Sequence, residues 1–176
     1  ISAGYGENPP AIGVDFFRGP LADANDGIDN DRDGEVDEDG EQIIMSKFVY
    51  YNNDFTITGN PGVADDYYNY LRGMWIDGSP MTYGGTGYGG SETCDFMFPG
   101  DTDASFDQNW DETTEGNLPA DRRFLQSAGP FTLEPGAVNY ITVGVVWARG
   151  NDGPLSSVEA LKEADIMAQE LFDNCF

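Results

Sequence analysis

The sequence contains no histidine, and its 176 residues include only two cysteines, Cys94 and Cys175. A chain without histidine lacks the usual general base of serine hydrolases and the commonest ligand of zinc and copper sites. Carboxylate-pair catalysis, as in glycosidases, needs no histidine, but the spacing of the acidic residues singles out no pair. We therefore expect that this chain is not an enzyme.

Basic residues are also scarce, with 8 Lys and Arg against 32 Asp and Glu and a net charge of −24. A field of this sign repels phosphate backbones and anionic lipid surfaces, so we expect no nucleic-acid partner. No apolar run approaches the roughly 20 residues that cross a bilayer, and we expect no membrane insertion. Such an acidic composition serves either solubility or the binding of divalent cations.

The two cysteines are compatible with one disulfide in an oxidising compartment. Two unpaired thiols, or a bond from one of them to a cysteine elsewhere, are the alternatives. A bond between Cys94 and Cys175 would close a loop of about 80 residues and stabilise the fold by about 4 kcal/mol in the chain-entropy model. The chain opens with Ile1 rather than Met, which we interpret as a mature or excised piece whose export signal lay upstream.

β-branched and aromatic runs between glycine- and proline-rich turns predict several short strands. These runs cover residues 12–17, 43–51, 95–98, 124–128, 130–133 and 139–148. Apolar spacing predicts a short helix from Ala64 to about Gly73 and a C-terminal helix over residues 156–172, capped by Ser156 with Glu159 completing a capping box. The length favours a single domain over residues 1–176.

These elements together predict a mainly β fold, an antiparallel β-sandwich of immunoglobulin-like or jelly-roll-like type with two helices. The hairpin over residues 131–146 is similar to hairpins of immunoglobulin-like sandwiches, with a Pro-Gly turn before an alternating strand. Both faces of the run 139–148 are apolar, which is typical of a central strand.

An acidic segment is inserted between the first two predicted strands, over residues 22–42. From Asp23 to Glu41 it reads DANDGIDNDRDGEVDEDGE, with ten acidic residues and Arg32 as its one base. A solvated loop without any ion would leave many carboxylates repelling each other with little compensation. We interpret the segment as a metal-binding loop.

Within this loop, carboxylates stand at positions 1, 3, 5 and 9 of a calcium-loop pattern, namely Asp29, Asp31, Asp33 and Asp37. Gly34 at position 6 permits the sharp turn, and Glu35 at position 7 would bind through its backbone carbonyl. Position 12, where an EF-hand has a bidentate acid, is glycine. Asp39 or Glu41 could compensate, or the ninth residue could bind the ion directly.

The spacing from Asp29 to Asp37 resembles the calcium repeats of thrombospondins and the loops of dockerins. Overlapping acidic repeats in those families imply a second ion upstream, held by Asp23, Asn25, Asp26 and the shared Asp29. Calcium, a hard cation that takes six to eight oxygen ligands, suits this set better than magnesium, which prefers to keep several waters.

Four segments resemble large modular surface proteins of Bacteroidetes and related bacteria, which commonly end in a type IX secretion sorting domain. These segments are GYGENPPAIGVDFFRGP, DYYNYLRGMW, PADRRFLQSAGPFTLEPGAVNYITVGVVWARG and SSVEALKEADIMAQELFDNCF. The resemblance implies an exported module of a multidomain parent, located outside the cell or on its surface. It implies no activity and no functional residues.

We therefore expect a non-catalytic, calcium-stabilised structural or adhesive module whose partners are calcium ions and other surface proteins or glycans. The alternative is a carbohydrate-binding module, in which exposed aromatic rings stack on sugars. Trp110, in a polar stretch, is the tryptophan that we expect to be exposed, whereas we expect Trp75 and Trp147 in the core.

Overall fold

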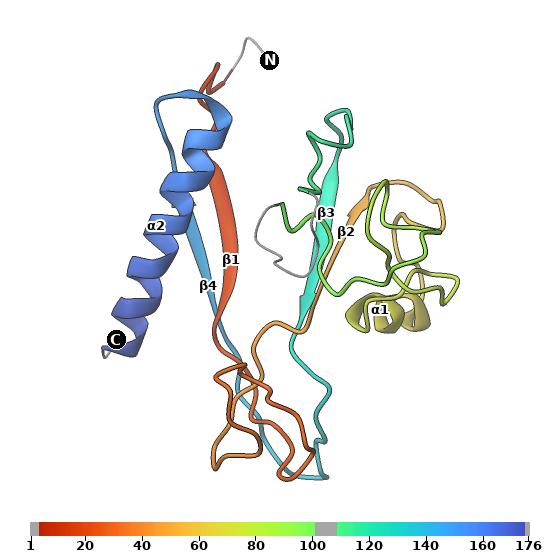
Figure 1. The fold of residues 1–176 in the computed structure, drawn as a ribbon, viewed down its shortest axis with the longest axis vertical. Coiled ribbons are helices and arrows are strands. Elements are labelled where there is room, and N and C mark those ends of the chain that lie inside the picture. The colour runs from red at the N-terminus through yellow and green to blue at the C-terminus, as the bar shows by residue number, and fades with distance from the viewer. Residues whose placement is uncertain (1–3, 101–108, 175–176) are drawn as a thin grey trace. The chain divides into compact units, whose positions relative to one another are not determined.

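The computed structural model describes residues 4–100 and 109–174 (Figure 1). The chain divides into two compact units, and we call residues 1–44 with 130–176 the first unit and residues 45–129 the second. Each unit has its own strand pair and its own helix, and the single domain over residues 1–176 stays a prediction. No helix in the described part of the chain is both long and apolar enough to cross a membrane.

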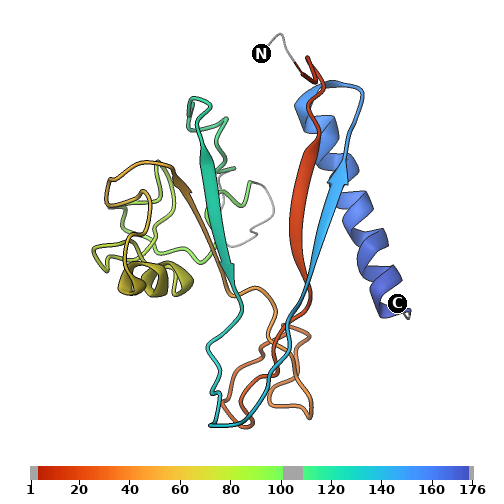
Figure 2. The same ribbon diagram turned by 180° about the vertical axis from the view of Figure 1, so that it is seen from behind.

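In the first unit, strand β1 (Ala11–Arg18) pairs antiparallel with strand β4 (Thr142–Ala148), and Val14 lies opposite Val145. Helix α2 (Gly153–Asp173) runs along one face of this strand pair (Figures 1 and 2). The runs of β-branched residues thus form the strands that the sequence predicts.

Glycines let α2 and its aromatic contacts lie close to the strands. A Cβ on Gly144 would lie 2.0 Å from Cζ of Phe17, whose ring lies 5.5 Å from the ring of Phe172 on α2. A Cβ on Gly13 would lie 3.3 Å from Cδ2 of Leu161. The core of the first unit therefore lies between α2 and one face of the strand pair.

The other face of the strand pair is apolar and exposed. Its side chains include those of Ile12, Val143, Val145 and Trp147, all at least half exposed. The prediction that Trp147 belongs to the core is wrong, because its side chain is 56% exposed. Successive strand residues point to opposite faces, and α2 covers only the face that carries the neighbouring Val146.

Helix α2 begins three residues before the predicted start, and the predicted capping box does not form. Ser156 lies in the first turn rather than at the N-cap, where its Oγ accepts a hydrogen bond from the Asp152 N–H at 3.0 Å. Pro154 follows the first helical residue, a position where its missing N–H costs nothing. The Gly-Pro pair thus starts the helix.

Asp165 of α2 gives a testable link between burial and stability. Burial, and then the charge of Asp15 on β1, raise the pKa of the Asp165 carboxyl above its ordinary value of 3.8. Because this pKa is raised in the folded state, the charge of Asp165 destabilises the fold above that pKa, and the cost disappears as the pH falls through it. We expect Asp165→Asn to raise the free energy of unfolding at pH 7 by less than about 1 kcal/mol, since solvent screens partly exposed charges.

Urea denaturation at pH 7 and at pH 3.5 checks this expectation. The gain should shrink at the lower pH, where Asp165 is mostly protonated in both states. Glu163→Gln is the control, because it removes an exposed acid from the same helix. It should not give the gain in the free energy of unfolding that is attributed to the charge of Asp15. A gain that is equal at both pH values would contradict the assignment.

In the second unit, strand β2 (Lys47–Asn52) pairs antiparallel with strand β3 (Arg122–Ser127), and Val49 lies opposite Leu125. Helix α1 (Ala64–Leu71) packs against this pair. The short helix predicted from Ala64 is confirmed, and it ends before Gly73, which adopts a left-handed φ of 72°.

The core of the second unit is aromatic. Trp75 is fully buried, as predicted, with its Nε1–H donating to the Gly87 carbonyl at 2.7 Å. Its ring meets that of Tyr70 edge to face at 5.8 Å. The buried cluster consists of Val49, Tyr51, Tyr70, Trp75, Met81, Cys94, Met97 and Trp110. Tyr70 and Trp75 are therefore used for packing.

Trp110 is only 1% exposed, so the prediction that it stands free in a polar loop is wrong. Its ring packs 4.9 Å from that of Phe98 and 5.8 Å from that of Tyr83, and its Nε1–H donates to the Gly85 carbonyl at 3.2 Å. Distant aromatic residues cover it, which its polar neighbours in sequence do not reveal.

Two of the predicted strands do not form. Residues 95–98 contribute a single bridge, between Phe96 and Phe48, and residues 130–133 are irregular. Both runs are short; Pro99 follows the first and Pro130 begins the second, and proline cannot donate a ladder hydrogen bond. Within residues 4–100 and 109–174 the chain therefore forms two small antiparallel sheets and two helices.

The predicted disulfide involves a residue outside the described part of the chain. Cys94 is buried in the core of the second unit, with 5% of its surface exposed. Cys175 is not among the described residues. The pairing of the two cysteines stays a prediction.

Candidate metal centre

The acidic loop is closed at its neck by an antiparallel bridge between Leu21 and Gln42. The Ala22 N–H donates to the Glu41 carbonyl at 2.9 Å, and the Ile43 N–H donates to the carbonyl of Pro20 at 2.8 Å. In Figure 1 the loop is drawn in orange beyond the end of β1. The ends of the loop are thus fixed to each other by backbone hydrogen bonds.

Gly19 makes this close approach possible. A Cβ at position 19 would lie 1.7 Å from the carbonyl oxygen of Ile43, far inside van der Waals contact. Ile43 itself is 2% exposed. The neck of the loop is therefore both tightly packed and buried.

Inside the loop, alternating carboxylates accept hydrogen bonds from backbone N–H groups that follow them. Asp29 accepts from Asp33 and Gly34, both at 3.1 Å, and Asp31 also accepts from Asp33 at 3.1 Å. Asp33 in turn accepts from Glu35 at 2.9 Å. These bonds curl the segment so that successive acidic side chains converge.

Left-handed residues provide the sharp turns that this curl requires. Arg32 and Asp37 have φ angles of 60° and 61°, and Gly34 has a φ of 100°. Asp tolerates the left-handed region because its short side chain bonds to nearby backbone, and glycine has no Cβ to clash. Gly34, at position 6 of the calcium-loop pattern, thus has the left-handed conformation for which glycine is favoured there.

Two groups of carboxylates meet in the loop and share Asp31. One group is Asp29, Asp31 and Glu41, and the other is Asp31, Asp33 and Glu38. Within each group, one carboxylate oxygen from every member lies within 4.8 Å of the others. Calcium binds oxygens at about 2.3–2.6 Å, so oxygens separated by no more than about twice that distance can share one ion.

Glu38 and Glu41 complete these groups from the less exposed side of the loop. Glu41 is 6% exposed and accepts a hydrogen bond from the Asn30 N–H. Oε2 of Glu38 is buried and has no hydrogen-bond partner among the described residues. A buried carboxylate oxygen without a donor is costly, and a bound cation would offset that cost.

The electrostatics of Glu38 agree with this geometry. A backbone hydrogen bond lowers the pKa of the Glu38 carboxyl, but burial and the charges of Glu41, Asp31 and Asp33 outweigh it, so that the pKa is raised. The surrounding negative field thus works against ionisation of Glu38. A divalent cation would reverse this balance, because an opposite charge nearby favours the ionised form.

Several predicted ligands lie elsewhere in the loop. Asp23 accepts three hydrogen bonds from Thr132, at 2.7 to 3.0 Å, which lower the pKa of its carboxyl. Asp37 accepts from the Gly27 N–H at 3.0 Å. Glu35, Asp39 and Asn25 are exposed and belong to neither carboxylate group.

The predicted upstream site has little support from these contacts. Asp26 accepts hydrogen bonds from the Ile28 N–H and the Asn30 side chain, while Asp23 is directed to Thr132. Among the described residues, no carboxylate group includes Asp23 or Asp26.

Glu38 is the member of the site that sequence reasoning missed, and Glu41 was considered only as a substitute for position 12. The signal was present, because Glu41 lies one residue beyond position 12 and Glu38 one beyond position 9. A one-residue offset is enough to change which acid reaches the centre of a tight loop.

The converging side chains offer only carboxylate oxygens, which suit hard cations such as calcium and not zinc or copper. The geometry of the two carboxylate groups could therefore accommodate a cation. Comparisons with protein-family models, with curated proteins and with solved structures found no match for this chain.

Proposed function

We propose that this chain is a non-catalytic structural or adhesive module whose first unit is stabilised by calcium bound in the acidic loop. The observation that carries the proposal is the pair of carboxylate groups around Asp31, with the buried, unpartnered Oε2 of Glu38 in one of them. Calcium would be held by Asp29, Asp31 and Glu41, or by Asp31, Asp33 and Glu38. Either ion would replace repulsion within the loop by attraction.

Bound calcium would also order the neck of the loop. Glu41 contributes its side chain to one of the carboxylate groups and its carbonyl to the hydrogen bond with Ala22. An ion at Glu41 would therefore couple the loop to the segment that follows β1. Coupling of this kind is expected of a structural site, in which binding energy contributes directly to stability.

Titration with calcium tests the proposal. We expect the wild-type chain to bind calcium, and we expect Asp31→Asn to weaken binding at least tenfold, because Asp31 belongs to both groups. At about 100 times the dissociation constant, calcium should add about 2.7 kcal/mol and raise the melting temperature by about 5–10 °C. Isothermal titration calorimetry and thermal denaturation, with and without a chelator, measure these effects.

Glu134→Gln is the matched control, since Glu134 is an exposed acid of the first unit outside the loop. This variant should bind calcium as the wild type does. Equal melting temperatures with calcium and with chelator, or a loss in Glu134→Gln as large as that in Asp31→Asn, would contradict the proposal.

The proposed setting is extracellular or on the cell surface, as the resemblance to Bacteroidetes surface proteins implies. Extracellular modules use calcium sites that are weak by intracellular standards, because calcium is abundant there. We also propose the antiparallel β-sandwich as the complete architecture. The apolar face around Trp147, exposed on β1 and β4, supports it, because one apolar sheet face needs a second layer.

A further inference from the structure

The second unit contains a pocket that is independent of the acidic loop. The pocket is small and partly open, with about 370 Å³ of empty space when its open mouth is counted. Its polar lining comes from both strands, from the loop at Thr86 and from the turn that follows Trp110. The side chains used below are those of Tyr50, Asn52, Thr86, Glu112, Asn117 and Arg122.

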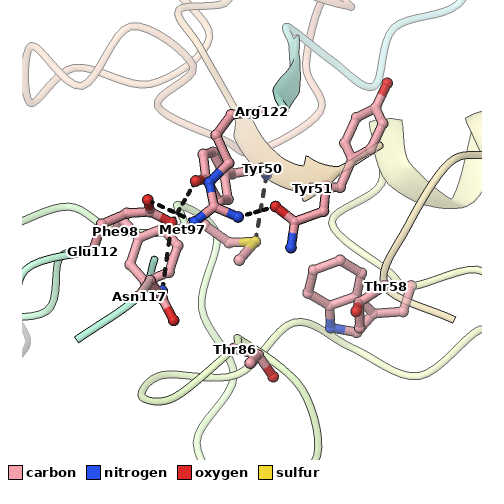
Figure 3. Close-up of a pocket in the computed structure, with 11 residues that line it drawn as sticks. Tyr50, Tyr51, Thr58, Thr86, Met97, Phe98, Glu112, Asn117 and Arg122 are labelled. Carbon is pink, nitrogen blue, oxygen red and sulfur yellow. Dashed lines mark hydrogen bonds and ion pairs between the residues drawn. The ribbon is translucent and has the colours of Figure 1, made fainter. Parts of the chain in front are cut away.

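Arg122 and Glu112 organise one side of the pocket (Figure 3). Nη2 of Arg122 lies 3.1 Å from Oε2 of Glu112, and Nη1 of Arg122 donates to Asn52. The hydroxyl of Tyr50 donates to Glu112, and the Arg122 guanidinium lies 5.3 Å from the centre of the Tyr50 ring. These contacts hold the charged groups at defined positions in the wall.

Part of the hydrogen-bonding capacity of these side chains is not used within the protein. Nε of Arg122 is buried and has no hydrogen-bond partner among the described residues. Asn117 contacts Glu112 only through a long hydrogen bond of 3.4 Å. Unsatisfied buried donors are rare in folded proteins and often mark the place of a water molecule or a ligand.

The hydrogen-bonding capacity of the lining indicates the chemistry of a ligand. Glu112 only accepts and Arg122 only donates, while the Asn117 amide and the Thr86 hydroxyl do both. Figure 3 shows Thr86 across the pocket from Arg122. A matching ligand presents several groups in a small space that both donate and accept, as adjacent hydroxyls do.

Aromatic rings supply an apolar surface beside these polar groups. Tyr50 meets Phe98 edge to face at 5.2 Å, and both line the pocket. The apolar C–H face of a sugar ring stacks against surfaces of this kind, while its hydroxyls bond to the polar wall.

Charge argues against an anionic ligand. Arg122 is neutralised by Glu112, and the whole chain carries a net charge of −24, which repels anions. A lining with one carboxylate also lacks the pair that glycoside hydrolysis requires. We propose that this pocket binds a single neutral sugar residue, and that it binds without cleaving it.

Binding of neutral monosaccharides tests the proposal. We expect at least one of glucose, galactose, mannose and N-acetylglucosamine to bind with a dissociation constant on the order of 1–10 mM, as is usual for so small a ligand. Glu112→Gln should raise the dissociation constant at least tenfold, because it removes the charged acceptor and the ion pair that positions Arg122. Calorimetry measures the affinities, and thermal denaturation verifies that the variant is folded.

Glu115→Gln is the matched control, since Glu115 is exposed and lies on the same turn outside the lining. In the wild-type protein, sugar should shift the nuclear magnetic resonance signals of the Asn52 and Asn117 side-chain amides, a readout that needs no substitution. A chelator should leave sugar binding intact. The sugar-binding proposal can therefore fail while the calcium proposal holds, and the reverse. Binding of phosphate or glucuronic acid alone, no binding of any sugar, or equal effects of the two variants would overturn the proposal.

Discussion

Replacing Gly19 by alanine is expected to lower the free energy of unfolding by about 3 kcal/mol, near the upper end of the range for overpacking. The added Cβ would lie 1.7 Å from the carbonyl oxygen of Ile43, and the positions of both atoms are fixed by the backbone of the loop neck. No side-chain rotation can relieve this clash, so the two segments must separate. The hydrogen bond from Ile43 to Pro20 would then break.

Because the neck holds Glu41, the same substitution should weaken calcium binding. Urea denaturation and calcium titration measure the two effects together. Gly62→Ala is the control, since a Cβ at position 62 would meet its nearest neighbour at 3.8 Å, an ordinary contact distance. If both variants were equally stable, the close approach of Gly19 and Ile43 would be refuted.

Replacing Trp75 by alanine is expected to destabilise the second unit by about 3–5 kcal/mol. The substitution removes a fully buried ring, its hydrogen bond to Gly87 and its edge-to-face contact with Tyr70. It would leave a large cavity beneath the pocket, because Trp75 also contributes to the pocket lining. Circular dichroism in the near ultraviolet, followed through a urea titration, reports the loss of this aromatic packing.

Phe55→Ala is the matched control within the same unit, since the Phe55 side chain is 97% exposed. We expect a change within about 0.5 kcal/mol for this variant. A similar loss in both variants would mean that the core of the second unit does not depend on Trp75.

Local sequence patterns predicted the elements but not which faces are covered. The strand over residues 142–148 follows from its β-branched run, and the helix from Ala64 follows from its apolar spacing. Trp110 and Trp147 were assigned to the wrong environments, because burial depends on partners far away in the chain. Phe98 covers Trp110, whereas α2 packs on the face of β4 opposite Trp147.

The same limit applies to the acidic loop. The spacing of Asp29, Asp31 and Asp33 was visible in the sequence, and Asp31 converges with Asp29 in one carboxylate group and with Asp33 in the other. The contributions of Glu38 and Glu41 depend on how the loop closes at its neck. Counting positions along the sequence from Asp29 does not reveal this closure. The role of Asp23 depends on Thr132, more than 100 residues later in the chain.

The pairing of β1 with β4 affects the order in which the protein acquires its structure. Ile12 pairs with Trp147, whereas all of residues 45–129 lie between them in the chain. On the ribosome, the second unit has its complete sequence before β4 has been synthesised, while β1 must wait for a partner. Closing so long a loop is entropically costly, and strand pairs of this kind form slowly. During that interval the apolar side chains of β1 lack their partner strand, which makes β1 the segment most in need of protection from aggregation.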